Sequence, residues 1–130
     1  MSRRECERQV ALVRSGTAGD REEAAGALWN LACRNSANEA DIYNAGGIEA
    51  LVALARNGAA GGQEAAARAL ADFTSDDEQN EVAVVVFEDG GLAALVELVA
   101  NGTAGAQEHA ARALGNLACE LCFGDIWLRL

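Results

Sequence analysis

The stretch NGTAGAQEHAARALGNLAC, residues 101–119, has two close relatives earlier in the chain. They are NGAAGGQEAAARALADFTS, which starts at residue 57, and SGTAGDREEAAGALWNLAC, which starts at residue 15. The leucine that all three share falls at Leu28, Leu70 and Leu114, at intervals of 42 and 44 residues. Stacked helical repeats have periods of about 40–47 residues. The chain is therefore predicted to be an array of similar layers.

Each copy carries apolar residues at the spacing of one helix face. In the long helix these are Ala24, Leu28 and Leu31, then Ala66, Leu70 and Phe73, then Ala110, Leu114 and Leu117. A preceding helix is predicted by Cys6, Val10 and Leu12, then Ile48, Leu51, Val52 and Leu54, then Leu92, Leu95, Val96 and Leu98. The segments NGAAGG and NGTAGA are predicted to be turns between the two helices, because glycine ends one helix and admits the next.

A third, short element precedes the AGGI and DGGL turns in two copies. Its sequences are NEADIYN, residues 38–44, and EVAVVVFE, residues 81–88. The second sequence is rich in β-branched residues and by itself would indicate a strand. The repeat places both in one role, so both are predicted to be helical. Ser36 with Glu39, and Ser75 with Glu78, match the capping-box spacing that begins a helix.

The composition of the 130-residue chain favours one helical domain. Apolar residues make up 51% and charged residues 23%, and proline is absent, which favours helix over sheet. The sequence contains no lysine, which excludes the phosphate-binding lysine of a P-loop and the lysine of Schiff-base chemistry. His109 has no partner that suggests catalysis, and no acid pair repeats. We expect no enzymatic activity and no cofactor.

The net charge of −10 repels phosphate backbones and anionic lipids. We therefore expect neither a nucleic-acid partner nor a membrane partner. The N-terminal stretch MSRRECERQV lacks the apolar core of a signal peptide, and the apolar runs are too short to span a membrane. These features predict a cytoplasmic or nuclear protein with reduced thiols.

The order of short helix, Gly-Gly turn, helix, Gly-rich turn and long helix resembles the armadillo repeat. The resemblance is carried by NAGGIEALVALARNG, EDGGLAALVELVANG and QEHAARALGNLA, and it covers most of residues 5–120. It is nearest to the armadillo-only proteins of plants and algae, whereas HEAT repeats share the period but lack these motifs. It implies an all-α, right-handed α-solenoid of about two and two-thirds repeats. The expected division is a partial repeat in 1–34, repeats in 35–76 and 77–120, and an apolar tail in 121–130.

The resemblance also implies a peptide-binding groove lined by the third helix of each repeat. A row of asparagines there grips the backbone of an extended peptide, because an amide side chain both donates and accepts hydrogen bonds. The matching residues are Asn30, Asp72 and Asn116. An ionised Asp72 only accepts, and we expect Arg68, four residues earlier, to neutralise it.

Two arginines flank this row and suggest the charge of the ligand. Family members that bind nuclear localisation signals carry tryptophan at the positions of Gly26, Arg68 and Arg112. Arginine there favours an acidic peptide instead. The alternatives are that these groups are merely solvated, or that the chain is a structural section of a larger scaffold. Trp29, beside Asn30, is expected either to floor the groove or to pack against the next repeat.

The cysteines allow two interpretations, a metal or redox site and simple apolar packing. Cys119 and Cys122 form a C-x-x-C pair, which in other contexts indicates zinc or thiol exchange. Cys33 and Cys119 fall at the same place in their copies, however, and Cys6 takes the position of Ile48 and Leu92. These three are therefore predicted to be small apolar fillers, with no metal bound.

The incomplete first repeat and the apolar tail predict self-association or low stability, because solenoid ends need polar outer faces. Trp127, in the tail, is expected to be a cap or a partner contact. The chain is then either a section of a longer array or an array whose tail serves as a makeshift cap.

Overall fold

The computed structural model describes residues 3–33, 35–75 and 81–123, excluding the side chains of residue 81 and residues 119–123. These residues form eight α-helices and no strand. The helices are α1 (Arg3–Ser15), α2 (Ala18–Ala32), α3 (Ser36–Asn44), α4 (Gly47–Asn57), α5 (Ala60–Ser75), α6 (Glu81–Glu88), α7 (Gly91–Asn101) and α8 (Ala104–Phe123). The all-α prediction is confirmed, including the helical assignment of the β-branched stretch in α6.

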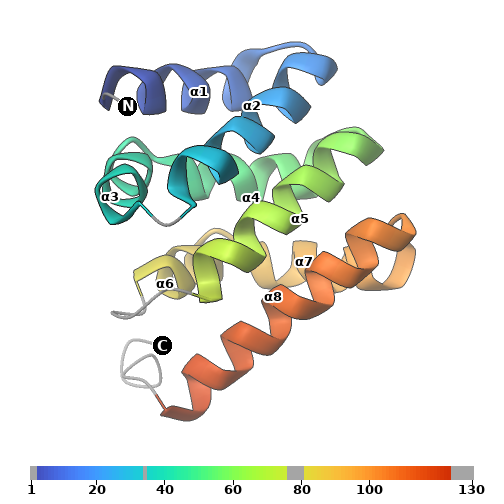
Figure 1. Cartoon of the computed structure of the whole chain (residues 1–130). Helices are drawn as coiled ribbons and strands as arrows, with labels where there is room; N and C mark the ends of the chain where they lie inside the picture. Colours follow the sequence, from blue (N-terminus) through green and yellow to red (C-terminus); the bar gives the residue numbers. More distant parts are fainter. Residues whose placement is uncertain (1–2, 34, 76–80, 124–130) are drawn as a thin grey trace.

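The helices stack in layers that follow the sequence repeat. Figure 1 shows α2, α5 and α8 lying side by side in one row, with α1, α4 and α7 in a second row behind them. Helix α5 packs against α2 on one side and α8 on the other, and α4 packs against both α1 and α7. This is the predicted right-handed α-solenoid. Helix α8 runs three residues into the predicted tail, and residues 124–130, with Trp127, lie outside the described residues.

The Gly-Gly turn sets the angle between the short helix and the next one. Gly46 has a φ of 83°, a left-handed conformation that costs glycine little and other residues more. Its neighbour Gly47 is buried so close to Ile42 that a Cβ atom would clash with this residue, and it would also crowd Val10. Gly90, with a φ of 77°, repeats the turn before α7. The first glycine of the pair is therefore favoured by its backbone conformation, and the second by the lack of space for a side chain.

The glycine-rich segments and the caps differ in detail from the predictions. Only Gly58 and Ala59 lie between α4 and α5, whereas the glycines that follow belong to the first turn of α5. Gly62 packs there against Leu54. The predicted cap Ser36 is the first residue of α3, and Asn35 caps the helix by accepting a hydrogen bond from the backbone N–H of Asn38. Glu78, of the other predicted box, lies outside the described residues.

Burial of the second helix depends on its place in the stack. In α4, which is covered by layers on both sides, Ile48, Val52 and Leu54 are all buried. In α7 the predicted apolar residues Leu92 and Val96 are instead exposed. They match Ile48 and Val52, which the next layer covers, and the described residues contain no layer beyond α7 and α8. Periodicity therefore identified the apolar stripe of each helix correctly, but it could not predict whether a neighbouring layer buries that stripe.

Candidate functional site

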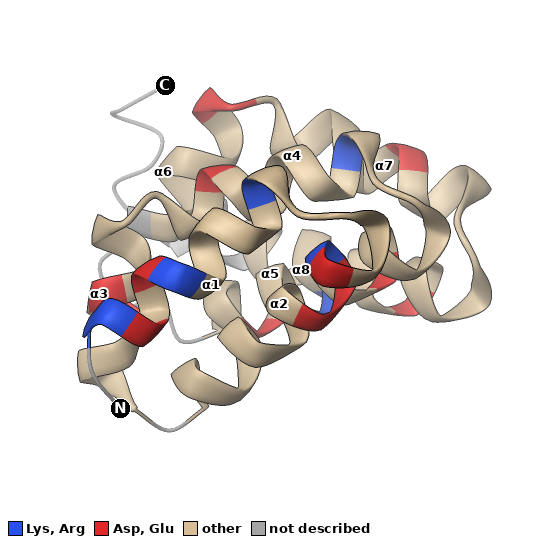
Figure 2. Ribbon diagram, turned by 90° about the horizontal axis from the view of Figure 1, so that it is seen from above, with Lys and Arg blue, Asp and Glu red and all other residues tan. Residues whose placement is uncertain are grey.

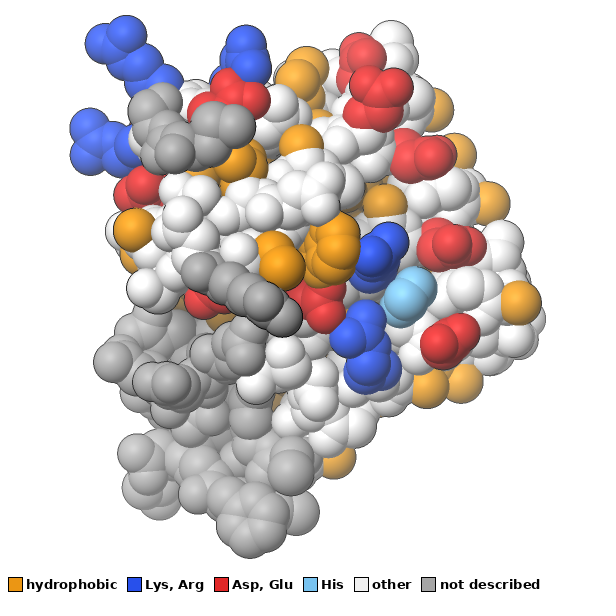
Figure 3. Space-filling view, in the orientation of Figure 1, with side chains coloured by type: hydrophobic (Ala, Val, Ile, Leu, Met, Phe, Trp, Pro, Cys, Tyr) orange, Lys and Arg blue, Asp and Glu red, His pale blue; other side chains and the backbone are white. Residues whose placement is uncertain are grey.

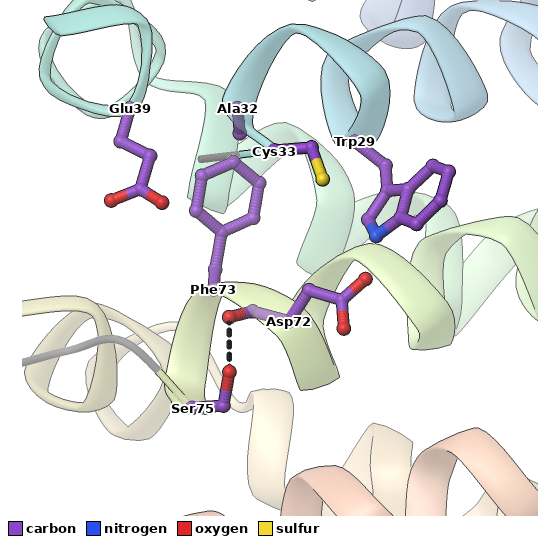
Figure 4. Close-up of a pocket in the computed structure, with 7 residues that line it drawn as sticks. All are labelled: Trp29, Ala32, Cys33, Glu39, Asp72, Phe73 and Ser75. Carbon is purple, nitrogen blue, oxygen red and sulfur yellow. Dashed lines mark hydrogen bonds between the residues drawn. The ribbon is translucent and has the colours of Figure 1, made fainter. Parts of the chain in front are cut away.

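Two hollows lie next to each other on the face formed by α2, α5 and α8. The first has a volume of about 240 Å³ and is shown in Figure 4. Its lining residues are Trp29, Ala32, Cys33, Glu39, Asp72, Phe73 and Ser75. The second, of about 220 Å³, is lined by Glu22, Gly26, Trp29, Gly61, Glu64, Ala65, Arg68 and His109. Trp29 lines both hollows, so its ring is the wall that they share.

Arg68 lies over this wall. Its guanidinium carbon is 3.9 Å from the centre of a Trp29 ring, which is the geometry of a cation–π contact. Trp29 is half-buried and packs against the hydrophobic core. The tryptophan therefore packs between repeats and also lines both hollows, and its role as the floor of a peptide groove stays a prediction. Arg68 is exposed and has no carboxylate partner among the described side chains.

Asp72 has a partner in the next layer and not in its own helix. Its Oδ1 accepts a hydrogen bond of 2.9 Å from Nη1 of Arg112 on α8. The predicted pair with Arg68 is therefore wrong, because Arg68 is turned onto Trp29. Nη2 of Arg112 also lies 3.2 Å from Nδ1 of His109. Arg112 is thus engaged on two sides, whereas Arg68 keeps its hydrogen-bond donors for another group.

The three residues of the predicted asparagine row, Asn30, Asp72 and Asn116, differ in the hydrogen bonds that they make. The amide Nδ2 of Asn116 donates to the carbonyl oxygen of Ala71 at 3.0 Å and to Oγ1 of Thr74 at 3.2 Å. Both of its donors are thereby used inside the protein, and only its carbonyl oxygen is left. Asn30 is exposed and makes no hydrogen bond within the described part of the chain. Asn30 is therefore the one member of the row with a complete free amide.

Charges around the hollows are arranged in a simple pattern. Figure 3 shows basic side chains and the histidine gathered near the middle of this face, with acidic side chains along one edge. Glu22, Glu64 and Glu108 occupy equivalent positions in the three long helices. Glu64 accepts a hydrogen bond of 2.9 Å from Oγ1 of Thr103 in the next layer. The centre of the face is basic, although the chain as a whole is acidic.

Sequence reasoning missed a second contact between layers. Nη2 of Arg14 donates to the carbonyl oxygen of Gly46 at 3.2 Å, and Arg56 donates to that of Asp89. Both arginines thus bind the Gly-Gly turn of the following repeat. Their spacing of 42 residues, equal to the repeat period, was the available signal. The third repeat has Ala100 at this position.

The cysteines do not share one environment. Cys6 is fully buried, and burial raises the pKa of its thiol. Cys33 is exposed at the end of α2, so the prediction that it is an apolar filler is wrong. The side chains of Cys119 and Cys122 lie outside the described residues, and their inertness stays a prediction. Among the described side chains, no group of three or more potential ligands could hold a metal ion.

No helix in the described ranges is long and apolar enough to cross a membrane. No curated protein matches the chain. Among solved structures, an engineered protein of the Northeast Structural Genomics Consortium is 34% identical, with a TM-score of 0.78 over 89% of this chain and 45% of its own. A designed armadillo repeat protein in complex with the peptide (KR)4 is 25% identical, with a TM-score of 0.74 over 85% of this chain and 45% of its own. The chain thus spans less than half the length of either protein.

The family comparison covers both complete layers. The Armadillo/beta-catenin-like repeat family matches residues 35–75 and again residues 79–119. The first range contains α3, α4 and α5, and the second contains α6, α7 and most of α8. Armadillo repeats form a class of non-enzymatic scaffolds for protein interaction. By fold, by repeat order and by this match, the chain belongs to the armadillo repeat family.

Proposed function

We propose that the chain is a noncatalytic interaction module that binds an extended peptide along the face formed by α2, α5 and α8. The groups that would hold the peptide are Asn30 and Arg68, with Trp29 as the wall beneath. Asp72, Arg112 and Asn116 contribute mainly by joining α5 to α8. Of the five polar residues predicted to line the groove, only Asn30 and Arg68 are therefore proposed to bind the peptide.

An acidic side chain of the peptide is proposed to lie at Arg68. The single observation that carries this choice is the guanidinium of Arg68, which is exposed, held over the ring of Trp29 and not paired with a carboxylate among the described residues. A held guanidinium loses less side-chain freedom when it binds a carboxylate than a mobile one does. His109 lines the same hollow and adds a polar contact.

A basic peptide is the second candidate, and two observations favour it. The designed armadillo protein that resembles this chain is in complex with (KR)4, a peptide of alternating lysine and arginine. The net charge of −10 and the row of Glu22, Glu64 and Glu108 also attract cations. The two candidates make opposite demands on Arg68, which an acidic peptide requires and a basic peptide avoids.

Selection of peptides by the protein itself distinguishes the candidates. Panning a phage-displayed library of random peptides on the wild-type chain should enrich acidic sequences. Against a selected peptide, Asn30→Ala should cost about 1–2 kcal/mol of binding free energy, and Arg68→Glu should cost more because it places like charges together. Both losses are measured by titration calorimetry, and the Arg68→Glu loss should shrink in high salt.

Glu49→Ala, on the exposed side of α4 in the other helix row, is the matched control and should leave binding unchanged. Enrichment of basic peptides would replace the first candidate with the second. Undiminished binding by a folded Asn30→Ala, Arg68→Glu double variant would place the peptide elsewhere on the molecule. If the library yields no binder at all, the interpretation as a structural section of a scaffold is favoured.

A further inference from the structure

The second hollow, which α2, α5 and α8 line together, holds charges of both signs. Glu22 and Glu64 contribute carboxylates to its wall, and Arg68 contributes a guanidinium. Figure 2, seen from above, shows acidic and basic segments on the ribbons of these three helices. Among the described side chains, no ion pair joins Arg68 to either glutamate. Unlike charges therefore line one hollow of about 220 Å³ without meeting each other.

Two of these charges are held in place by uncharged neighbours. The carboxylate of Glu22 lies against Gly61 in the first turn of α5, so close that a Cβ atom at Gly61 would clash with it. The first turn of a helix carries a partial positive charge, which favours a carboxylate at this place. Arg68 is held over the ring of Trp29. Both groups are thus positioned, and both still line the hollow.

The carboxylate of Glu22 lacks a partner that the same position has one layer further on. Glu64 matches Glu22 and accepts a hydrogen bond of 2.9 Å from Oγ1 of Thr103. In the turn before α5, Ala59 stands at the position of Thr103, and its side chain has no donor. Glu22 accordingly makes no hydrogen bond or ion pair with the other described side chains.

Arg68 lacks a charged partner for a similar reason. Arg112 matches Arg68 and pairs with Asp72 of the preceding layer at 2.9 Å. One layer earlier, Asn30 stands at the position of Asp72, and its neutral amide offers no charge to Arg68. Two differences between the copies, Ala59 and Asn30, therefore leave one unpaired charge of each sign at this hollow.

We propose that the second hollow selects a peptide with charges of both signs, an aspartate or glutamate at Arg68 and a lysine or arginine at Glu22. This inference rests on the proposed function, because it assigns a second charge to the same acidic peptide. Both protein groups gain a partner, and no ion pair within the protein has to break. Residues i and i+2 of an extended peptide point to the same side and stand about 7 Å apart. The two charged residues of the peptide are therefore expected at this spacing.

A double-mutant cycle by titration calorimetry tests the second charge. It uses an acidic peptide selected by panning, both with its basic residue and with that residue replaced by glutamine. Glu22→Gln should weaken binding of the first peptide about threefold to fivefold and leave binding of the second unchanged. Glu22→Lys should reverse the preference, and bind more tightly a peptide with glutamate in place of the basic residue.

Glu108→Gln is the matched control for these variants. Glu108 holds the equivalent position in α8, is exposed and does not line the hollow. Its substitution removes the same charge from the chain and should leave the affinity of both peptides unchanged. Unchanged circular dichroism shows that each variant is folded.

The outcomes separate this inference from the proposed function. Weaker binding by Arg68→Glu, together with equal affinities of Glu22→Gln and Glu108→Gln, would overturn the second charge and keep the acidic peptide. Selected acidic peptides without a recurrent lysine or arginine two residues from an acidic residue would do the same. If panning yields no peptide, or if Arg68→Glu binds undiminished, the proposed function fails and this inference fails with it.

Discussion

Helices α1 and α7 occupy equivalent places in the first and last layers, yet they present opposite chemistry to solvent. On α1, Glu5, Arg8 and Gln9 replace residues that are buried in α4, and they satisfy one another by hydrogen bonds. The bond from Arg8, followed by that from Gln9, holds the pKa of Glu5 below its usual range. On α7, by contrast, Val96 keeps the apolar character of Val52.

The comparison teaches that one repeat sequence codes for two separate faces. Residues of α4 divide into those that face the previous layer, such as Leu51, and those that face the next, such as Val52. On α1 three of the four positions that match the first set are polar, Glu5, Arg8 and Gln9, whereas the fourth, Leu12, is an exposed apolar residue. The expectation that the two ends of the array are unsatisfied stays a prediction.

The largest expected difference lies between two equivalent valines. Val52→Asp should lower the free energy of unfolding by about 4 kcal/mol or more, because it buries a charge between two layers. Val96→Asp should change it by less than about 0.5 kcal/mol in the monomer, because that side chain is 53% exposed. Urea denaturation followed by circular dichroism at low protein concentration measures both values. Comparable losses would mean that another part of the chain covers α7.

The arginine contacts to the Gly-Gly turns should have a smaller effect. Arg14→Ala and Arg56→Ala should each cost about 0.5–1 kcal/mol, the value of a hydrogen bond at an exposed site. Arg4→Ala on the exposed part of α1 is the control, since Arg4 makes no hydrogen bond or ion pair among the described residues. If urea denaturation gives Arg14→Ala the same stability as Arg4→Ala, the turn contact contributes nothing.

A third change converts the first end into an open one. The double variant Arg8→Ala, Gln9→Leu gives α1 the residues that α4 has at the matching positions, Ala50 and Leu51. Stability should change by less than about 0.5 kcal/mol, since both positions are on the surface. Assemblies larger than the wild-type species should appear in sedimentation velocity, because two unlike apolar ends can join head to tail. Persistence of the wild-type distribution would contradict a role of Arg8 and Gln9 in preventing association.

The smallest expected effect is a difference in thiol reactivity between two cysteines, which involves no change in stability. Cys6 faces the inside of the first layer, where burial raises the pKa of its thiol, whereas Cys33 is exposed. Iodoacetamide at neutral pH should modify Cys33 at least about tenfold faster than Cys6. Peptide-resolved mass spectrometry follows both rates in one sample, and modification in urea is the control. Equal rates in the native protein would show that α1 detaches readily from the second layer.

Several parts of this structure could be read from the sequence because they recur. The intervals of 42 and 44 residues predicted the long helices, and the register of the repeat overrode the strand-like composition of α6. For the candidate site, the sequence predicted which residues lie on the shared face but not which side chains contact one another. Spacing within α5 places Arg68 next to Asp72, but the contact with Arg112 depends on how α8 lies against α5. Exposure of Val96 likewise depends on a neighbouring layer and not on its own helix.

The sandwiched position of α4 and α5 also has a consequence for folding. Because the main contacts join neighbouring layers, cooperativity should pass along the array as in a one-dimensional lattice. Amide hydrogens in the middle of α5 should then exchange with solvent only through near-global opening, whereas those of α1 and α7 exchange through local fraying. Nucleation is expected in the central layer, from which the outer two add on. The middle repeat would thus be both the most stable part of the protein and the part that folds first.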